Sequence, residues 1–302
     1  IIMNSEFLVC LADKMATHLG PEVLRTLRFA ASDEWRETLE QSSFTWKGSD
    51  PEKWKGFGRL WRDGGHYNAS IILDGSVSKY VIETTVPTPI AAGNLAAALE
   101  FAIGNPIRVG VESQSQFTAF VSIQIKERPH SDTFPPLRID NYKPKGNLTP
   151  LSIDGLEFGK KGGIRRFGQN YCSVPIRLFD HWERASTSLA SIADSQDKTT
   201  WEKSMCTAVS TAFVESGELV FIENEQSWEQ VGSQYLSRWG FGKIEHILAS
   251  QDSLSFAVKS DANPCMVAGL LMGCMHRGMG KNIYPEWEII DDTTSIRFDM
   301  TR

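Results

Sequence analysis

The chain has 302 residues, of which 31 are basic and 37 acidic, so its formal charge at pH 7 is −6. Hydrophobic residues make up 41% of the chain and charged residues 23%, which is typical of a globular protein and excludes wholesale disorder. The acidic balance argues against a dedicated nucleic-acid binder. No stretch approaches about 18 uninterrupted apolar residues, so we expect no transmembrane helix and no membrane partner.

Cysteine usage and the N-terminus indicate the compartment. The five cysteines are scattered along the chain without a close pair, which is typical of reduced thiols, so we expect a cytoplasmic protein. The first residues lack the basic and apolar regions of a signal peptide. Both ends of the chain are consistent with a fragment of a larger protein, and the length suggests two domains.

The first part of the chain predicts helices followed by strands. Apolar residues recur with a 3.6-residue period from Phe7 to Leu19, and Gly20-Pro21 then favours a helix end and a new helix start. An alanine-rich run at 90–103 predicts a further helix. Runs rich in β-branched residues predict strands at 67–73, 79–85, 107–111 and 117–125.

Residues 126–170 differ in composition from the sequence on either side. Five of the 13 prolines lie here, and nine basic against five acidic side chains give this stretch a charge of +4. A flexible linker explains this composition, and so does a basic arm lying across an acidic surface. We therefore predict a first domain at 1–126, a linker or arm at 127–170 and a second domain at 171–302.

The last part of the chain repeats the order of the first. Helices are predicted near 175–190, 199–216, 228–239 and 266–279. Strands are predicted near 241–248, 254–258, 287–290 and 295–300. Helices, strands, one helix and further strands in each part favour an α+β fold over an alternating α/β fold.

Short sequence matches indicate that one unit occurs twice. Gly-Phe-Gly at 56–58 recurs at 240–242, and in each part a later glycine-led helix ends at a second glycine after the same 11 residues. The closing segments 109–125 and 284–300 have equal lengths of 17 residues. Three features in the same order favour an internal duplication.

Each copy resembles the vinyl-4-reductase domain family, whose fold is shared with small subunits of the TRAPP vesicle-tethering complex. The resemblance rests on the Gly-Phe-Gly turn into a strand, the later glycine-led helix and the final strand pair. It implies a small helical bundle packed on a twisted antiparallel sheet, with the two copies arranged as a pseudo-dimer. Family members bind small apolar or aromatic molecules and dimerise. Some bind zinc through cysteines near the C-terminus, but residues 284–302 contain no cysteine, so that site is not carried over.

Signatures of catalysis are absent, so we predict no catalytic residues. The sequence has no phosphate-binding loop, no dinucleotide-binding glycine pattern and no His-Glu-x-x-His or Cys-x-x-Cys motif. Its six histidines are dispersed. Asp180 and His181 are adjacent, but neighbouring side chains on a helix point about 100° apart, so we expect a surface or capping role for them.

The helix at 266–279 is rich in methionine. Cys265, Met272, His276 and Met279 are predicted to share one helical face, and such a face could ligate a soft metal or a heme iron. Because His276 aligns with Glu100 of the first copy, we favour an apolar pocket over a metal or heme, and we predict no cofactor. The predicted ligand-binding residues are Trp201, Met205, Trp239, Phe241, Met272 and Met275.

Small residues four apart recur on the corresponding helices. Gly93 and Ala97 in the first copy match Gly269 and Gly273 in the second. A glycine inside a helix favours close packing, because it otherwise destabilises the helix. Two arrangements are open: the copies pack on each other along this stripe, or each helix packs on its own sheet.

The residues and the resemblance together predict a non-enzymatic sensory or regulatory module. A small hydrophobic molecule would bind inside at least one copy and control a signalling or transcriptional output domain or partner. Homo-oligomerisation remains open. A scaffold or assembly protein of the TRAPP-subunit type, with no small ligand, is the main alternative, and a heme or metal sensor that uses His276 is another.

Overall fold

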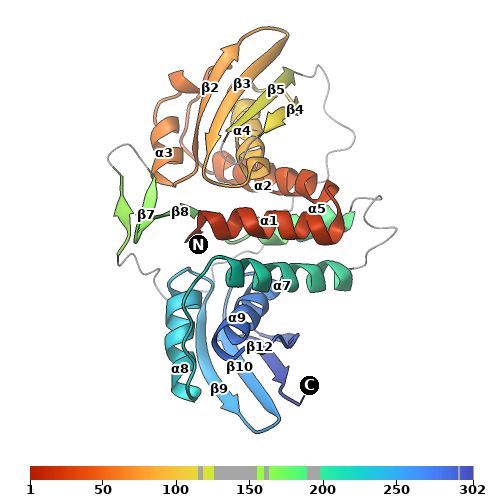
Figure 1. The fold of residues 1–302 in the computed structure, drawn as a ribbon. Helices are drawn as coiled ribbons and strands as arrows, with labels where there is room; N and C mark the ends of the chain where they lie inside the picture. Colours follow the sequence, from red (N-terminus) through yellow and green to blue (C-terminus); the bar gives the residue numbers. More distant parts are fainter. Residues whose placement is uncertain (115–117, 126–154, 160–162, 189–197, 292, 302) are drawn as a thin grey trace.

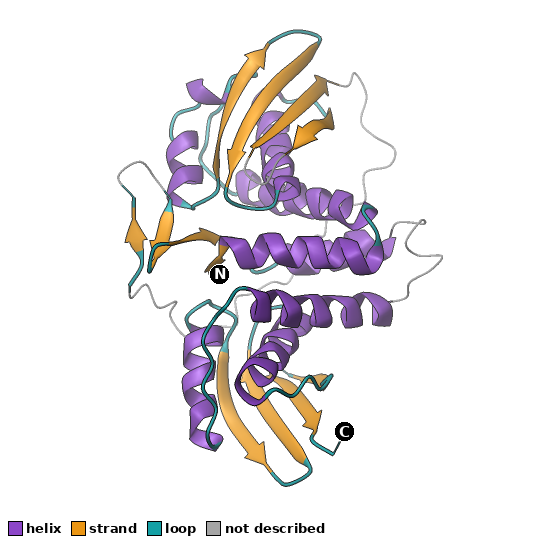
Figure 2. Cartoon of the chain, viewed as in Figure 1, coloured by secondary structure: helices purple, strands orange, loops and turns teal. Residues whose placement is uncertain are grey.

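The computed structural model describes residues 1–114, 118–125, 155–159, 163–188, 198–291 and 293–301. Helices gather in the middle of the molecule, and an antiparallel sheet lies at each end (Figures 1 and 2). The predicted α+β class is therefore confirmed. Within the described ranges, no helix is both long and apolar enough to cross a membrane.

Most helices and strands of the first half lie where the sequence predicts them. The elements are β1 (Ile2–Asn4), α1 (Ser5–Leu19), α2 (Glu22–Glu40), α3 (Phe57–Asp63), β2 (Tyr67–Leu73), β3 (Val77–Thr84), α4 (Thr88–Ile103), β4 (Ile107–Gln114) and β5 (Thr118–Ile125). Helix α1 begins where the side chain of Asn4 accepts a hydrogen bond from the backbone N–H of Glu6 at 2.8 Å. It ends at Gly20, whose φ of 86° suits glycine.

The second half has the same succession of elements. They are α5 (Leu178–Ser188), α7 (Lys198–Glu215), α8 (Glu225–Val231), the π-helical turn η2 (Gly232–Ser237), β9 (Lys243–Ala249), β10 (Ser253–Lys259), α9 (Pro264–Met279), β11 (Glu286–Ile290) and β12 (Thr293–Asp299). All of its predicted strands and helices are confirmed to within a few residues.

The two large sheets have the same topology. Their strand orders are β2-β3-β5-β4 and β9-β10-β12-β11, and every neighbouring pair is antiparallel. In both halves, the fourth strand of the unit inserts between the second and the third. Both halves therefore share one sheet topology.

A third, small sheet joins the halves and was not predicted. It has the order β1-β8-β7-β6, with β6 at Glu157–Phe158, β7 at Ile164–Arg166 and β8 at Gln169–Ser173. Most of the predicted arm lies outside the described residues. The described part of it buries Arg166, whose guanidinium lies 5.7 Å from the centre of the Tyr171 ring.

The glycine-led helices each pack closely on the second helix of their own half. A Cβ at Gly93 would lie 2.3 Å from the carbonyl oxygen of Arg28 on α2. A Cβ at Gly269 would lie 2.7 Å from the carbonyl oxygen of Cys206 on α7. One at Gly273 would lie 3.0 Å from Phe213, also on α7. The stripe of small residues therefore joins helix to helix within each half, which is neither of the two arrangements that the sequence left open.

The predicted match between the two Gly-Phe-Gly sequences was also wrong. The first does not turn into a strand: Gly56, with φ of 81°, precedes helix α3, whereas the second leads directly into β9. The hydroxyl of Ser260 donates to the carbonyl of Phe241, and the hydroxyl of Thr85 donates to the carbonyl of Gly65. The first-half counterpart of the second turn is therefore the Gly64–His66 segment.

The first helix of each half packs on the other half. Helix α1 lies mainly against α7 of the second half, and α5 lies mainly against α2 of the first (Figure 1). Trp182 on α5 donates its indole N–H to the carbonyl of Val23 on α2 at 2.9 Å. Phe7 on α1 packs edge-on against Trp239, with ring centres 5.2 Å apart. The halves thus exchange their first helices.

Candidate functional site

The predicted ligand-binding residues are all buried in the core, but they are spread along it: Trp201 and Phe213, which packs against Trp239, lie about 18 Å apart along α7. Trp201 and Met205 come from α7, Met272 and Met275 from α9, and Trp239 and Phe241 from the segment between η2 and β9. Each is at most 4% exposed. The sulfur atoms of Met272 and Cys206 are 4.0 Å apart, so sulfur lines the contact between α7 and α9.

One polar atom in this core has no partner. The indole N–H of Trp201 is buried and makes no hydrogen bond to any described residue. Its neighbour Trp182 lies edge-on, with ring centres 6.4 Å apart, and offers its own N–H to α2 instead. A buried donor without an acceptor costs about 1–3 kcal/mol, so this N–H can recognise an acceptor atom on a bound molecule.

The second-half core also touches the first half directly. Besides its ring contact with Phe7, Trp239 accepts a hydrogen bond through its carbonyl oxygen from the backbone N–H of Ile2 at 3.0 Å. The rings of Tyr235 and Trp239 are perpendicular at 6.2 Å. Movement of Trp239 would therefore disturb β1 and α1.

A surface groove of about 690 Å³ lies elsewhere in the second half, between the α8–η2 segment and the edge strand β9. Its lining includes Glu225, Glu229 and Glu245, together with Lys243 and His246. None of the six predicted ligand-binding residues lines it. The groove is lined by both charged and apolar side chains, Ile244 and Ile247 among them, and it is separate from the site that the sequence predicts.

The methionine-rich face does not converge on one point. At a rise of about 1.5 Å per residue, Cys265 and His276 lie about 16 Å apart along α9. Cys265 is buried, whereas Met279 is 39% exposed. A single metal ion cannot bind both ends of this face.

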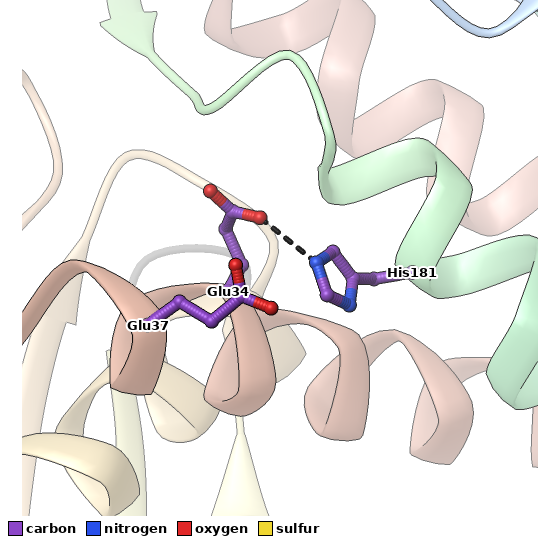
Figure 3. Close-up of side chains that lie close together, drawn as sticks. All are labelled: Glu34, Glu37 and His181. Carbon is purple, nitrogen blue, oxygen red and sulfur yellow. Dashed lines mark ion pairs between the residues drawn. The ribbon is translucent and has the colours of Figure 1, made fainter. Parts of the chain in front are cut away.

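A charged cluster crosses the contact between α2 and α5. His181 on α5 points its Nε2 atom at Glu34 on α2, 3.0 Å from Oε2, and Glu37 lies one helical turn further along α2 (Figure 3). Arg177, which directly precedes α5, forms an ion pair with Glu37 at 2.9 Å. His181 is 3% exposed and Glu34 8% exposed. Two halves of the chain thus supply one buried group of titratable side chains.

His181 faces Glu34 and not its sequence neighbour Asp180. The adjacent Asp180 accepts a hydrogen bond from the side chain of Asn263 at 3.0 Å, and burial raises its pKa to about 6. His181 is buried against α2, so the surface or capping role predicted for it was wrong. The overlooked signal is spacing: Glu34 and Glu37 are three residues apart on α2 and so share one helical face.

Comparison with known proteins gives no relative: no family model, no curated protein and no solved structure matches this chain.

Proposed function

We propose that the protein is a non-enzymatic regulatory module made of two vinyl-4-reductase-like domains that form a pseudo-dimer within one chain. The equal strand order of the two sheets supports this proposal. So do the matching close contacts of Gly93 and Gly269 and the reciprocal exchange of the helices α1 and α5. A dimer of single-copy relatives would correspond to the two halves of this chain.

In this proposal the second half binds a small apolar or aromatic molecule that carries one hydrogen-bond acceptor. The observation that carries the proposal is the unpartnered indole N–H of Trp201, which lies buried among apolar and sulfur-containing side chains. An acceptor on the ligand would satisfy this donor, and the apolar remainder would pack between α7 and α9. Methionine side chains there can adapt to ligands of different shape.

The ligand signal would pass through Trp239. This side chain packs against Phe7 of the exchanged helix α1, so ligand binding next to α7 would favour one packing of the two halves over another. An output domain or partner protein would respond to that packing.

A scaffold or assembly protein without a small ligand is the second candidate. The observation that favours it is the close packing of the same core, in which Trp201, Met205, Phe241 and Met275 all have 0% exposure. A core that is already filled needs no ligand for stability.

Native mass spectrometry of freshly purified protein distinguishes the two candidates. A retained apolar mass supports the regulatory module, and its retention should decrease in Trp201→Phe, which removes the N–H and keeps a large aromatic ring. Trp228→Phe is the matched control, because Trp228 is equally buried but packs against Phe256 on the sheet side of the second half. A chain without any bound mass, whose melting temperature no aromatic probe raises, would favour the scaffold.

A further inference from the structure

The Glu34–Glu37–His181 cluster has the dimensions of a metal site. One ligand atom from each side chain lies within 4.8 Å of the other two. Ligands bound to Zn²⁺ at 2.0–2.2 Å in tetrahedral geometry are separated by about 3.3 Å. The Nε2 atom of His181 and the Oε2 atom of Glu34 are already 3.0 Å apart, so small side-chain rotations complete the set (Figure 3).

Two of these ligand atoms have no hydrogen-bond partner. Among the described residues, neither Oε2 of Glu34 nor Nε2 of His181 makes a hydrogen bond, although both atoms are buried. The two atoms face each other without the alignment of a hydrogen bond. Buried polar atoms are normally satisfied, and a cation between them would satisfy both at once.

The surrounding charges leave room for a cation. Arg177 donates to one oxygen of Glu37 at 2.9 Å and so holds the orientation of that carboxylate. Arg36, the nearest basic residue on α2, is engaged by Asp33 at 2.7 Å and Glu100 at 2.8 Å. The two glutamates therefore keep a net negative charge after Arg177 is counted.

From this geometry we propose that Glu34, Glu37 and His181 bind one divalent transition-metal ion, with Zn²⁺ as the best match. Imidazole and carboxylate are ligands that Zn²⁺ accepts, and three protein ligands leave one position for water. The ion joins α2 of the first half to α5 of the second. It therefore fastens the exchanged helix in place and regulates how firmly the halves are held together.

We expect one ion per chain, because the α1–α7 contact lacks the ligands found at the α2–α5 contact. There, Glu215 on α7 faces Lys14 on α1 at 2.6 Å, and Cys10 donates to the same carboxylate at 3.2 Å. A lysine already supplies the positive charge at that position, and no histidine takes part among the described residues.

Calorimetric titration of chelator-treated full-length protein with zinc chloride tests the proposal. We expect one Zn²⁺ per chain and a rise in melting temperature that grows with zinc concentration. Glu37→Gln and His181→Gln should each weaken binding at least tenfold. Glu40→Gln is the matched control, because Glu40 is an exposed residue on the same helix.

The outcomes separate the site from adventitious binding. Zinc binding that is absent, or equally tight in wild type, Glu37→Gln and Glu40→Gln, would overturn the proposal. If His181→Gln does not fold, as judged by circular dichroism, Glu37→Gln carries the test, because Glu37 lies at the edge of the cluster with 21% of its side chain exposed. Visible absorption of bound Co²⁺ that is lost in Glu37→Gln would support the same ligand set.

Discussion

The two exchanged-helix contacts have the same architecture but different chemistry. At α2–α5, polar groups are buried: Trp182 bonds to the backbone of α2, and the hydroxyls of Thr26 and Ser186 are 2.7 Å apart. At α1–α7, the polar group is an ion pair at the surface, in which the Glu215 side chain is 50% exposed. The centre of that contact is apolar, with Leu11 and Met15 fully buried on α1.

This difference shows how two helix contacts of the same architecture can serve different purposes. Burial of apolar side chains stabilises a contact without requiring an exact geometry. Buried polar groups cost free energy in every arrangement that leaves them without a hydrogen-bond partner. We therefore expect α1–α7 to supply most of the cohesion between the halves and α2–α5 to specify their correct arrangement.

The largest effect is expected where the halves are alike. Gly93→Ala places a methyl group 2.3 Å from a backbone oxygen that cannot rotate away, and Gly269→Ala places one 2.6 Å from Val209. Overpacking should lower the free energy of unfolding by about 3 kcal/mol at Gly93 and about 2 kcal/mol at Gly269, measured by urea denaturation. Gly75→Ala, with nothing within 4 Å, is the control and should change little. Equal stability of all three variants would contradict the close helix contacts.

A pH-dependent effect should distinguish the halves. Burial lowers the pKa of His66 to about 4, below its ordinary 6.5, and the corresponding position in the second half is Gly242. The unfolded chain therefore binds the proton first, so stability is complete above pH 6.5 and decreases as the pH falls toward 4, by about 3 kcal/mol. Denaturation of His66→Gln across this range should lack that loss. If the free energy of unfolding of the variant decreased with pH as it does in the wild type, the acid sensitivity would belong to other groups.

The smallest effects on stability are expected from removing the two ion pairs, Arg177–Glu37 and Lys14–Glu215. Arg177→Met removes a pair whose side chains are 14% and 21% exposed, and it should cost about 1–3 kcal/mol. Lys14→Met removes the exposed pair and should cost less than about 0.5 kcal/mol. Thermal denaturation at low and high salt measures both, and salt should reduce the second effect further. Equal costs would mean that the two contacts do not differ as described.

Local patterns in the sequence predict most of the elements, because their periodicity is strong. Gly93 and Gly104 of α4 have the same 11-residue spacing as Gly269 and Gly280 of α9, because each helix needs a glycine at the close contact and another at its end. These two demands together fix the alignment of the copies.

The short Gly-Phe-Gly match misled for a physical reason. The matched residues Gly56 and Gly240 both have positive φ, at 81° and 88°, but the first directly precedes a helix and the second lies three residues before a strand. A left-handed glycine permits either continuation, so three residues cannot fix the register.

The spacing of the glutamates on α2 is visible in the sequence, but their pairing with His181 is not, because it depends on the helix exchange. The periodicity of α1 and α5 predicts an apolar face on each helix, but it does not say which helix covers that face. Only the fold brings Glu34 and His181, 147 positions apart in the sequence, to a distance of 3.0 Å.

The crossing of the opening helices has an evolutionary consequence. Deleting the N-terminal segment through Leu19 would uncover α7 and so destabilise the second half more than the first half, to which the segment belongs in sequence. A chain that kept only one half would have a first helix without the helix it packs on, and a second helix without its cover. Sequence changes at these contacts in one half therefore affect the fold of the other, so the two halves are constrained to change together.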